Sequence, residues 1–120
     1  MQYIGVDIIE ISRIEAVIKR WGRTFLERVF TPSELESYNN TSSLAARFAA
    51  KEAVLKAIGA CDKGISWQDI EILAEGSGKP MVNLSGRAKL QADASAIYKI
   101  NISLSHSKDY AVAFAIGETA

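Results

Sequence analysis

Hydrophobic residues recur with two different periods along the chain, and each period predicts one kind of element. Over residues 2–9, apolar residues alternate with Gly5 and Asp7, and a period of two predicts a β-strand. Over residues 11–28, apolar residues recur at spacings of three and four, which predicts a helix that Gly22 interrupts. The chain therefore opens with a strand followed by a helix.

Two further helices are predicted from their start and stop signals. Thr31 can cap a short helix, Pro32 suits its first turn, and Glu34 completes a capping box. An Ala-rich helix follows over residues 41–58, with Thr and Ser residues at its start as caps and Gly59 as its stop.

The second half of the chain changes to short alternating segments. Residues 68–75 and 80–84 predict the two strands of a hairpin. Residues 85–97 predict a helix, and residues 98–104 and 110–116 predict a second hairpin. The sum is an α+β domain in which one antiparallel or mixed sheet carries helices largely on one face.

Composition narrows the class of protein. The chain has 120 residues, of which 48% are hydrophobic, and this is the size of one domain with one core. No apolar run approaches the roughly 20 residues that span a bilayer, and no secretory signal is visible, so we expect a cytoplasmic protein without a membrane partner. The single cysteine, Cys61, excludes an internal disulfide and disfavours a zinc site, and we assign it no role.

Charge is balanced overall but unevenly distributed. The 14 basic and 14 acidic residues cancel, which argues against a nucleic-acid-binding protein. Between Arg13 and Arg28, however, five basic residues outnumber two acidic ones, and Arg13, Arg20 and Arg23 lie opposite the apolar stripe. These arginines form either a solvated face or a docking surface for an acidic partner.

The helix over residues 41–58 carries charges where its apolar positions predict burial. On a helical wheel Lys51 falls inside the apolar stripe, Glu52 and Lys56 lie on its shoulder, and alanines make a second side. In one interpretation Glu52 and Lys56 are an ordinary i,i+4 pair and Lys51 extends its ammonium to water. In the other, charge at the edge of a core marks a functional site.

Asp7 is a second exception, because it lies on an otherwise apolar strand. It either accepts a hydrogen bond from a nearby backbone amide or acts as a hard oxygen ligand. Asp7 and Glu52 together would supply the two carboxylates that Mg²⁺ commonly takes. That pairing requires the first strand and the long helix to pack together.

The single histidine, His106, lies in a predicted turn among Ser105, Ser107 and Lys108. A histidine in a turn is either solvated or helps to line a phosphate site. Residues 76–79, Gly-Ser-Gly-Lys, lack the spacing of a Walker A motif and by themselves indicate only a hairpin turn.

Taken in order, these motifs resemble one known family, the short bacterial 4′-phosphopantetheinyl transferases of the holo-acyl-carrier-protein synthase type. The resemblance covers residues 5 to about 115, and Phe-Ala-Ala-Lys-Glu-Ala followed by Lys-Ala is its most specific part. The motifs that carry it are Gly5-Val6-Asp7-Ile8, Arg13-Ile14, Phe48-Ala49-Ala50-Lys51-Glu52-Ala53-Val54-Leu55-Lys56-Ala57, Gly78-Lys79-Pro80 and Ser103-Leu104-Ser105-His106-Ser107.

The resemblance implies a fold, a reaction and an assembly. It implies a single 4′-phosphopantetheinyl transferase domain over residues 1–120, with the sheet packed against the long helix. The implied enzyme transfers 4′-phosphopantetheine from coenzyme A to a serine of apo acyl carrier protein, releases adenosine 3′,5′-bisphosphate, uses Mg²⁺ and supports fatty acid biosynthesis. It also implies a homotrimer with active sites at the subunit interfaces.

The resemblance further assigns roles to individual residues. Asp7 and Glu52 are the implied metal ligands. Glu52, directly or through water, or Asp7 through water, is the candidate base, and Lys56 offsets charge on the leaving group. The implied coenzyme A contacts are Arg47, Lys51, Gly78, Lys79, Pro80, Ser105, His106 and Ser107. Arg13, Arg20 and Arg23 form the expected carrier-protein surface.

Two alternatives stay open at this point. One is a relative that binds coenzyme A without transferring the arm, or a non-enzymatic trimeric interaction module. The other is a different phosphate-handling enzyme on a small α+β sheet. The intact set of Asp7, Glu52 and Lys56 disfavours a degenerate relative.

Overall fold

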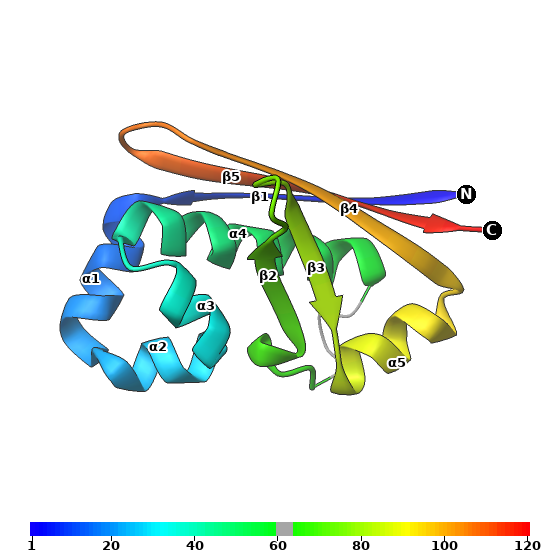
Figure 1. Ribbon diagram of the computed structural model, residues 1–120, viewed down its shortest axis with the longest axis horizontal. Helices are drawn as coiled ribbons and strands as arrows, with labels where there is room; N and C mark the ends of the chain where they lie inside the picture. Colours follow the sequence, from blue (N-terminus) through cyan, green and yellow to red (C-terminus); the bar gives the residue numbers. More distant parts are fainter. Residues whose placement is uncertain (60–63) are drawn as a thin grey trace.

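Helices and strands follow one another as an α+β chain in the computed structural model, which describes residues 1–59 and 64–120 (Figure 1). Cys61 lies outside the described residues. The elements are β1 (Gln2–Glu10), α1 (Ile11–Trp21), α2 (Arg23–Val29), α3 (Pro32–Ser37), α4 (Thr41–Ile58), η1 (Trp67–Asp69), β2 (Ile70–Ala74), β3 (Pro80–Leu84), α5 (Gly86–Ala94), β4 (Ile97–His106) and β5 (Tyr110–Thr119). The predicted fold class is confirmed.

The strands form two antiparallel sheets rather than the single sheet expected from the sequence. One sheet has the order β1-β5-β4, and β2 pairs only with β3 in the other. Figure 1 shows β3 diverging from β4, and the backbones of these two strands do not pair. The helices and the β2–β3 hairpin all lie on one side of the three-stranded sheet (Figure 1).

Local hydrogen bonds explain where the observed elements differ from the predicted ones. Asn40, and not the hydroxyl residues after it, caps α4, because its side-chain oxygen accepts a hydrogen bond from Ser43 N at 2.8 Å. β2 starts later than expected, because Ser66 and Asp69 close a capping box around η1. α5 ends early, before Ala96 adopts a positive φ of 60°.

α4 packs against the three-stranded sheet through small residues. Its alanine side, which the wheel predicts as a row of methyl groups, is buried against alanines of β5. A Cβ placed on Gly5 of β1 would lie 1.9 Å from Ala53 O and 2.8 Å from Ala57 N. The backbones of β1 and α4 are therefore in direct contact, and only glycine fits at position 5.

Gly5→Ala tests this contact. We expect the free energy of unfolding to fall by at least about 2 kcal/mol, because the added methyl group meets backbone atoms that cannot rotate away. Urea unfolding measures the change. Gly76→Ala is the matched control, since a Cβ there meets nothing within 4 Å. Superimposable curves for Gly5→Ala and the parent chain would contradict the contact.

Candidate active site

The three predicted catalytic residues lie where β1 crosses α4. Asp7 points to the same side of β1 as Gly5, because side chains alternate along a strand, and this side faces α4. Lys56 Nζ lies 3.3 Å from Asp7 Oδ1 and also donates a hydrogen bond to Val6 O at 2.9 Å. Glu52 precedes Lys56 by one helical turn. The strand and helix contact that the Asp7–Glu52 pair requires is therefore present.

The electrostatics of this group are those of two crowded carboxyls. Burial raises the pKa of Glu52, the neighbouring Asp7 carboxylate raises it further, and Lys56 acts in the opposite direction. Among the described residues, no group of three or more His, Cys, Asp or Glu side chains is arranged to hold a metal ion. Asp7 and Glu52 offer two carboxylate groups. Mg²⁺ commonly binds one or two protein carboxylates and fills its other coordination positions with water and substrate phosphates.

Most of the predicted coenzyme contacts line one separate cavity of about 410 Å³. Its walls come from α4, the turn between β2 and β3, and β4. The lining residues are Ala46, Arg47, Gly78, Lys79, Pro80, Ile102, Ser103, Leu104, Ser105 and His106. Arg47, Lys79 and His106 each carry N–H groups that can donate to phosphate oxygens.

Arg47 stands out within this cavity. Its Nε atom is buried and has no hydrogen-bond partner among the residues that the structure describes. Its guanidinium carbon lies 3.8 Å from the centre of the Tyr38 ring. Tyr38 was not predictable as part of this cavity wall, because a cation–aromatic contact between residues far apart in the sequence leaves no spacing signal.

The carboxylates and the cavity lie on opposite flanks of α4. Glu52 follows Arg47 by five residues, which places it about 140° further around the helix. Asp7 lies on β1 and the cavity is lined by β4, and these are the two edge strands of the sheet. Within one chain, the carboxylates and the cavity therefore lie at opposite edges of the sheet.

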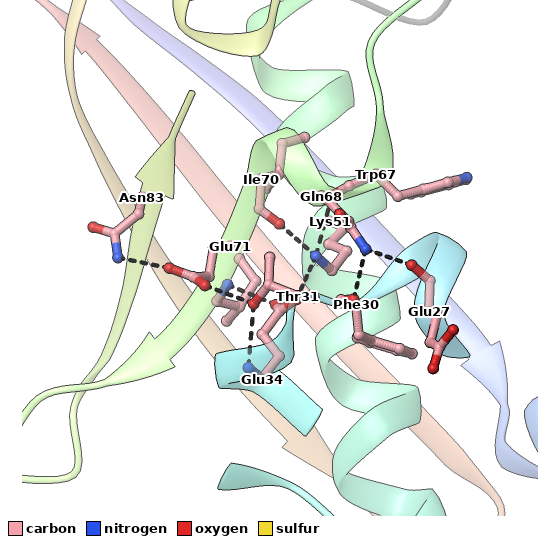
Figure 2. A network of polar contacts seen from close by, with 11 residues as sticks. Glu27, Phe30, Thr31, Glu34, Lys51, Trp67, Gln68, Ile70, Glu71 and Asn83 are labelled. Atoms are coloured by element: carbon pink, nitrogen blue, oxygen red, sulfur yellow. Dashed lines mark hydrogen bonds and ion pairs between the residues drawn. The ribbon is translucent and has the colours of Figure 1, made fainter. Parts of the chain in front are cut away.

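Lys51 belongs to neither group, and its predicted role as a coenzyme contact is wrong. Its side chain is 0% exposed, and Nζ donates to Glu34 Oε1 at 2.8 Å, to Trp67 O at 3.1 Å and to Ile70 O (Figure 2). These bonds use all three protons of the ammonium. Lys51 also does not extend to water, because its partner carboxylate lies inside the core.

Glu34 ties three elements together. Its carboxylate accepts hydrogen bonds from Lys51 on α4, from Thr31 N at the start of α3, and from Ile72 N on β2. The sequence predicts Glu34 as part of a capping box, which the structure confirms, but not as a partner of Lys51. The signal for a buried acidic partner was Lys51 itself, because a lysine that is buried within an apolar stripe needs a carboxylate beside it.

Ser107 is a second departure from the predicted coenzyme contacts. It does not line the cavity; its Oγ accepts a hydrogen bond from Tyr110 N at 3.3 Å and closes the turn between β4 and β5. His106 is the last residue of β4 rather than part of this turn, and this places it in the cavity wall.

The predicted carrier-protein residues Arg13, Arg20 and Arg23 are exposed on α1 and α2. Arg23 pairs with Glu27 at 2.9 Å, within its own helix. An apolar hollow of about 320 Å³ lies on the same two helices, and its lining residues are Val17, Trp21, Thr24, Phe25 and Arg28. This surface thus combines exposed positive charge with an apolar hollow.

No described helix is both long and apolar enough to traverse a bilayer.

Comparison with known proteins finds the same family along the whole chain. The model of the 4′-phosphopantetheinyl transferase superfamily matches residues 3–115. A holo-[acyl-carrier-protein] synthase of Dehalococcoides mccartyi is 49% identical over 119 residues, which covers 98% of this chain and 99% of the relative. One of Moorella thermoacetica is 51% identical over 120 residues, covering 97% and 93%.

Solved structures agree with the sequence relatives. The holo-[acyl-carrier-protein] synthase of Helicobacter pylori in complex with coenzyme A superimposes with a TM-score of 0.86 at 37% identity, covering 96% of this chain and 99% of that one. The enzyme of Neisseria meningitidis gives a TM-score of 0.89 at 33% identity, with 98% of both chains covered.

Lys51→Met tests the buried ion pair. We expect a loss of about 3–5 kcal/mol of unfolding free energy, because the Glu34 carboxylate would stay buried without its cation. Lys89→Met, which breaks the exposed pair with Asp93 at 2.8 Å, should change stability by less than about 0.5 kcal/mol. Chemical denaturation compares the two variants, and equal, small effects would show that the Lys51 pair does not hold the core.

Proposed function

This chain belongs to the 4′-phosphopantetheinyl transferase superfamily, and from that premise we propose the role of each site residue in the reaction. The protein is a transferase that moves the 4′-phosphopantetheine group of coenzyme A to a serine of apo acyl carrier protein. The observation that carries the residue assignment is the meeting of Asp7, Glu52 and Lys56 on one flank of α4. We propose that residues 1–120 form one transferase domain. A cytoplasmic location and a role in fatty acid biosynthesis remain predictions.

The reaction demands a base and a counter-charge. The serine oxygen forms a bond to the phosphorus that carries the pantetheine arm, and the bond to the phosphate of adenosine 3′,5′-bisphosphate breaks. We propose Glu52, directly or through water, as the acceptor of the serine proton, because it lies beside Asp7 and Lys56 where β1 meets α4. Lys56, one turn away and exposed, offsets the charge that develops on the departing phosphate.

Asp7 and Glu52 are the proposed ligands of Mg²⁺. They fit a hard divalent cation, because both offer carboxylate oxygens and because their closeness raises the pKa of Glu52. When bound there, the cation supplies positive charge to the pyrophosphate of coenzyme A. The backbone contact at Gly5 keeps the strand that carries Asp7 against the helix that carries Glu52.

The outer face of the sheet supports a homotrimer. This face, on the side away from α4, exposes the apolar side chains of Ile4, Val6, Ile8 and Phe114. Contiguous exposed apolar surface of this kind marks an interaction site. We propose that other copies of the chain cover it, and that the β1 edge of one copy meets the β4 edge of the next. The carboxylates of one chain then face the cavity of its neighbour, and coenzyme A spans the interface.

The carrier protein is proposed to dock on α1 and α2. Acyl carrier proteins are acidic, so Arg13 and Arg20 provide electrostatic steering toward the serine-bearing partner. The apolar hollow that contains Trp21 would receive a side chain of the partner. Arg23 contributes less, because Glu27 already neutralises it.

Glu52→Gln tests the residue assignment. With apo carrier protein, coenzyme A and Mg²⁺, mass spectrometry should show the parent chain adding one phosphopantetheine group per carrier. The variant should turn over at least about 100-fold more slowly, because an amide cannot take the proton, while its melting temperature stays unchanged. Glu36→Gln, an exposed position on α3, is the control. A near-parental rate for Glu52→Gln would remove Glu52 from the mechanism.

Ile8→Asp tests the assembly. Ile8 is 64% exposed in the single chain, and a carboxylate there should dissociate the trimer and abolish transfer. Leu90→Asp, at 68% exposure on α5, should leave the assembly intact. Sedimentation and the transfer assay give the readouts, and an active monomer would contradict interfacial sites. At a coenzyme A concentration below the parental KM, mixing Glu52→Gln chains with Arg47→Ala chains should give a rate above that of either variant alone, since some interfaces then pair two intact halves.

A further inference from the structure

Tyr38 and Arg47 form a stacked pair at the wall of the cavity. The guanidinium carbon lies 3.8 Å from the ring centre, which is close contact for a cation on an aromatic face. The ring therefore restrains the position of the guanidinium, whose N–H groups are donors that can bind phosphate oxygens. Nε is buried and has no hydrogen-bond partner among the described residues, and Arg47 lines the cavity.

The position of Tyr38 is set by the buried ion pair. Tyr38 N donates to Glu34 O at 2.9 Å at the end of α3, and the Glu34 carboxylate is fixed by Lys51 on α4 (Figure 2). Lys51 follows Arg47 by one helical turn. The pairs Glu34–Lys51 and Tyr38–Arg47 are therefore successive contacts between the same two helices, and the buried pair holds α3 where the ring can support the guanidinium.

The charges around the cavity indicate which anion it fits. Arg47, Lys79 and His106 gather donors at one place, with no carboxylate among the lining residues. A phosphate monoester carries about two negative charges at neutral pH, whereas each phosphate of a pyrophosphate diester carries about one. Glu52, which is assigned with Asp7 to the pyrophosphate, leaves α4 on the opposite flank. The remaining anion of coenzyme A is its 3′-phosphate monoester.

We infer that Tyr38 is a positioning residue whose ring holds the Arg47 guanidinium for the 3′-phosphate, and that it thereby sets the preference for coenzyme A over dephospho-coenzyme A. The inference rests on the proposed function, because it assigns one group of the same substrate. Tyr38 acts through Arg47 and does not touch the reacting atoms.

Binding of two nucleotides tests the inference on the intact protein. By titration calorimetry, Tyr38→Leu should weaken adenosine 3′,5′-bisphosphate about 5- to 30-fold and leave adenosine 5′-monophosphate unchanged. Leucine keeps the apolar packing of Tyr38 beside Phe30 and Leu44. Tyr38→Phe, which keeps the ring and removes the hydroxyl, should match the parent chain. In the transfer assay, Tyr38→Leu should raise KM for coenzyme A and leave kcat and the KM for dephospho-coenzyme A unchanged.

Two further variants complete the test. In an Arg47→Met chain, adding Tyr38→Leu should have no further effect, because the ring has no guanidinium to hold. Arg47→Lys leaves Tyr38 in place and should lose the same discrimination, so the test survives if Tyr38→Leu folds poorly. Equal weakening of both nucleotides, additive effects with Arg47→Met, or a Tyr38→Phe loss as large as that of Tyr38→Leu would overturn the inference. A parent chain that transfers nothing to apo carrier protein would instead overturn the proposed function.

Discussion

The direct contact between the backbones of β1 and α4 is the constraint on which the site depends. At Gly5 no side chain separates the strand from Ala53 of the helix, so the two elements approach as closely as backbones allow. Asp7, two residues further along β1, is thereby carried to the flank of α4 that holds Glu52 and Lys56. Because a strand in a paired sheet and an 18-residue helix are both rigid, the two carboxylates are placed without any loop.

Side chains of α4 that are close in the sequence lie in three different environments. The helical period decides which environment each side chain enters. Its alanines face the sheet, Glu52 faces the β1 edge, and Lys51, the preceding residue, points into the core toward α3. Successive residues differ by about 100° around the helix, so neighbours in the sequence do not share a site. Three charges within six residues, at 51, 52 and 56, therefore mark one proposed reaction site and one structural ion pair.

Sequence periodicity predicted the elements well, because each is formed by local preferences that repeat along the chain. The apolar pattern also singled out Asp7 and Glu52 as a pair of candidate metal ligands, on condition that the first strand and the long helix pack together. The catalytic role of Lys56 and the grouping of Gly78–Pro80 with Ser105–His106 came from the family resemblance. The partner of Lys51 was not predictable in the same way, since it lies 17 residues away on another helix and only tertiary packing brings it close. The division into two sheets was not predictable either, because the partner of each strand depends on tertiary packing and not on that strand's own pattern.

The buried pair of Lys51 and Glu34 raises the question of why a core this small keeps two charges. Desolvating both groups costs several kcal/mol per ion, and a well-packed apolar pair often serves stability equally well. Apolar contacts, however, tolerate sliding of one helix along another, whereas the hydrogen bonds of Lys51 to Glu34, Trp67 and Ile70 are satisfied in one register. That register decides where α3 ends on α4, and hence where the ring that supports Arg47 lies. A single register in which all three ammonium protons are bonded is what this charged pair supplies and an apolar pair of similar volume does not.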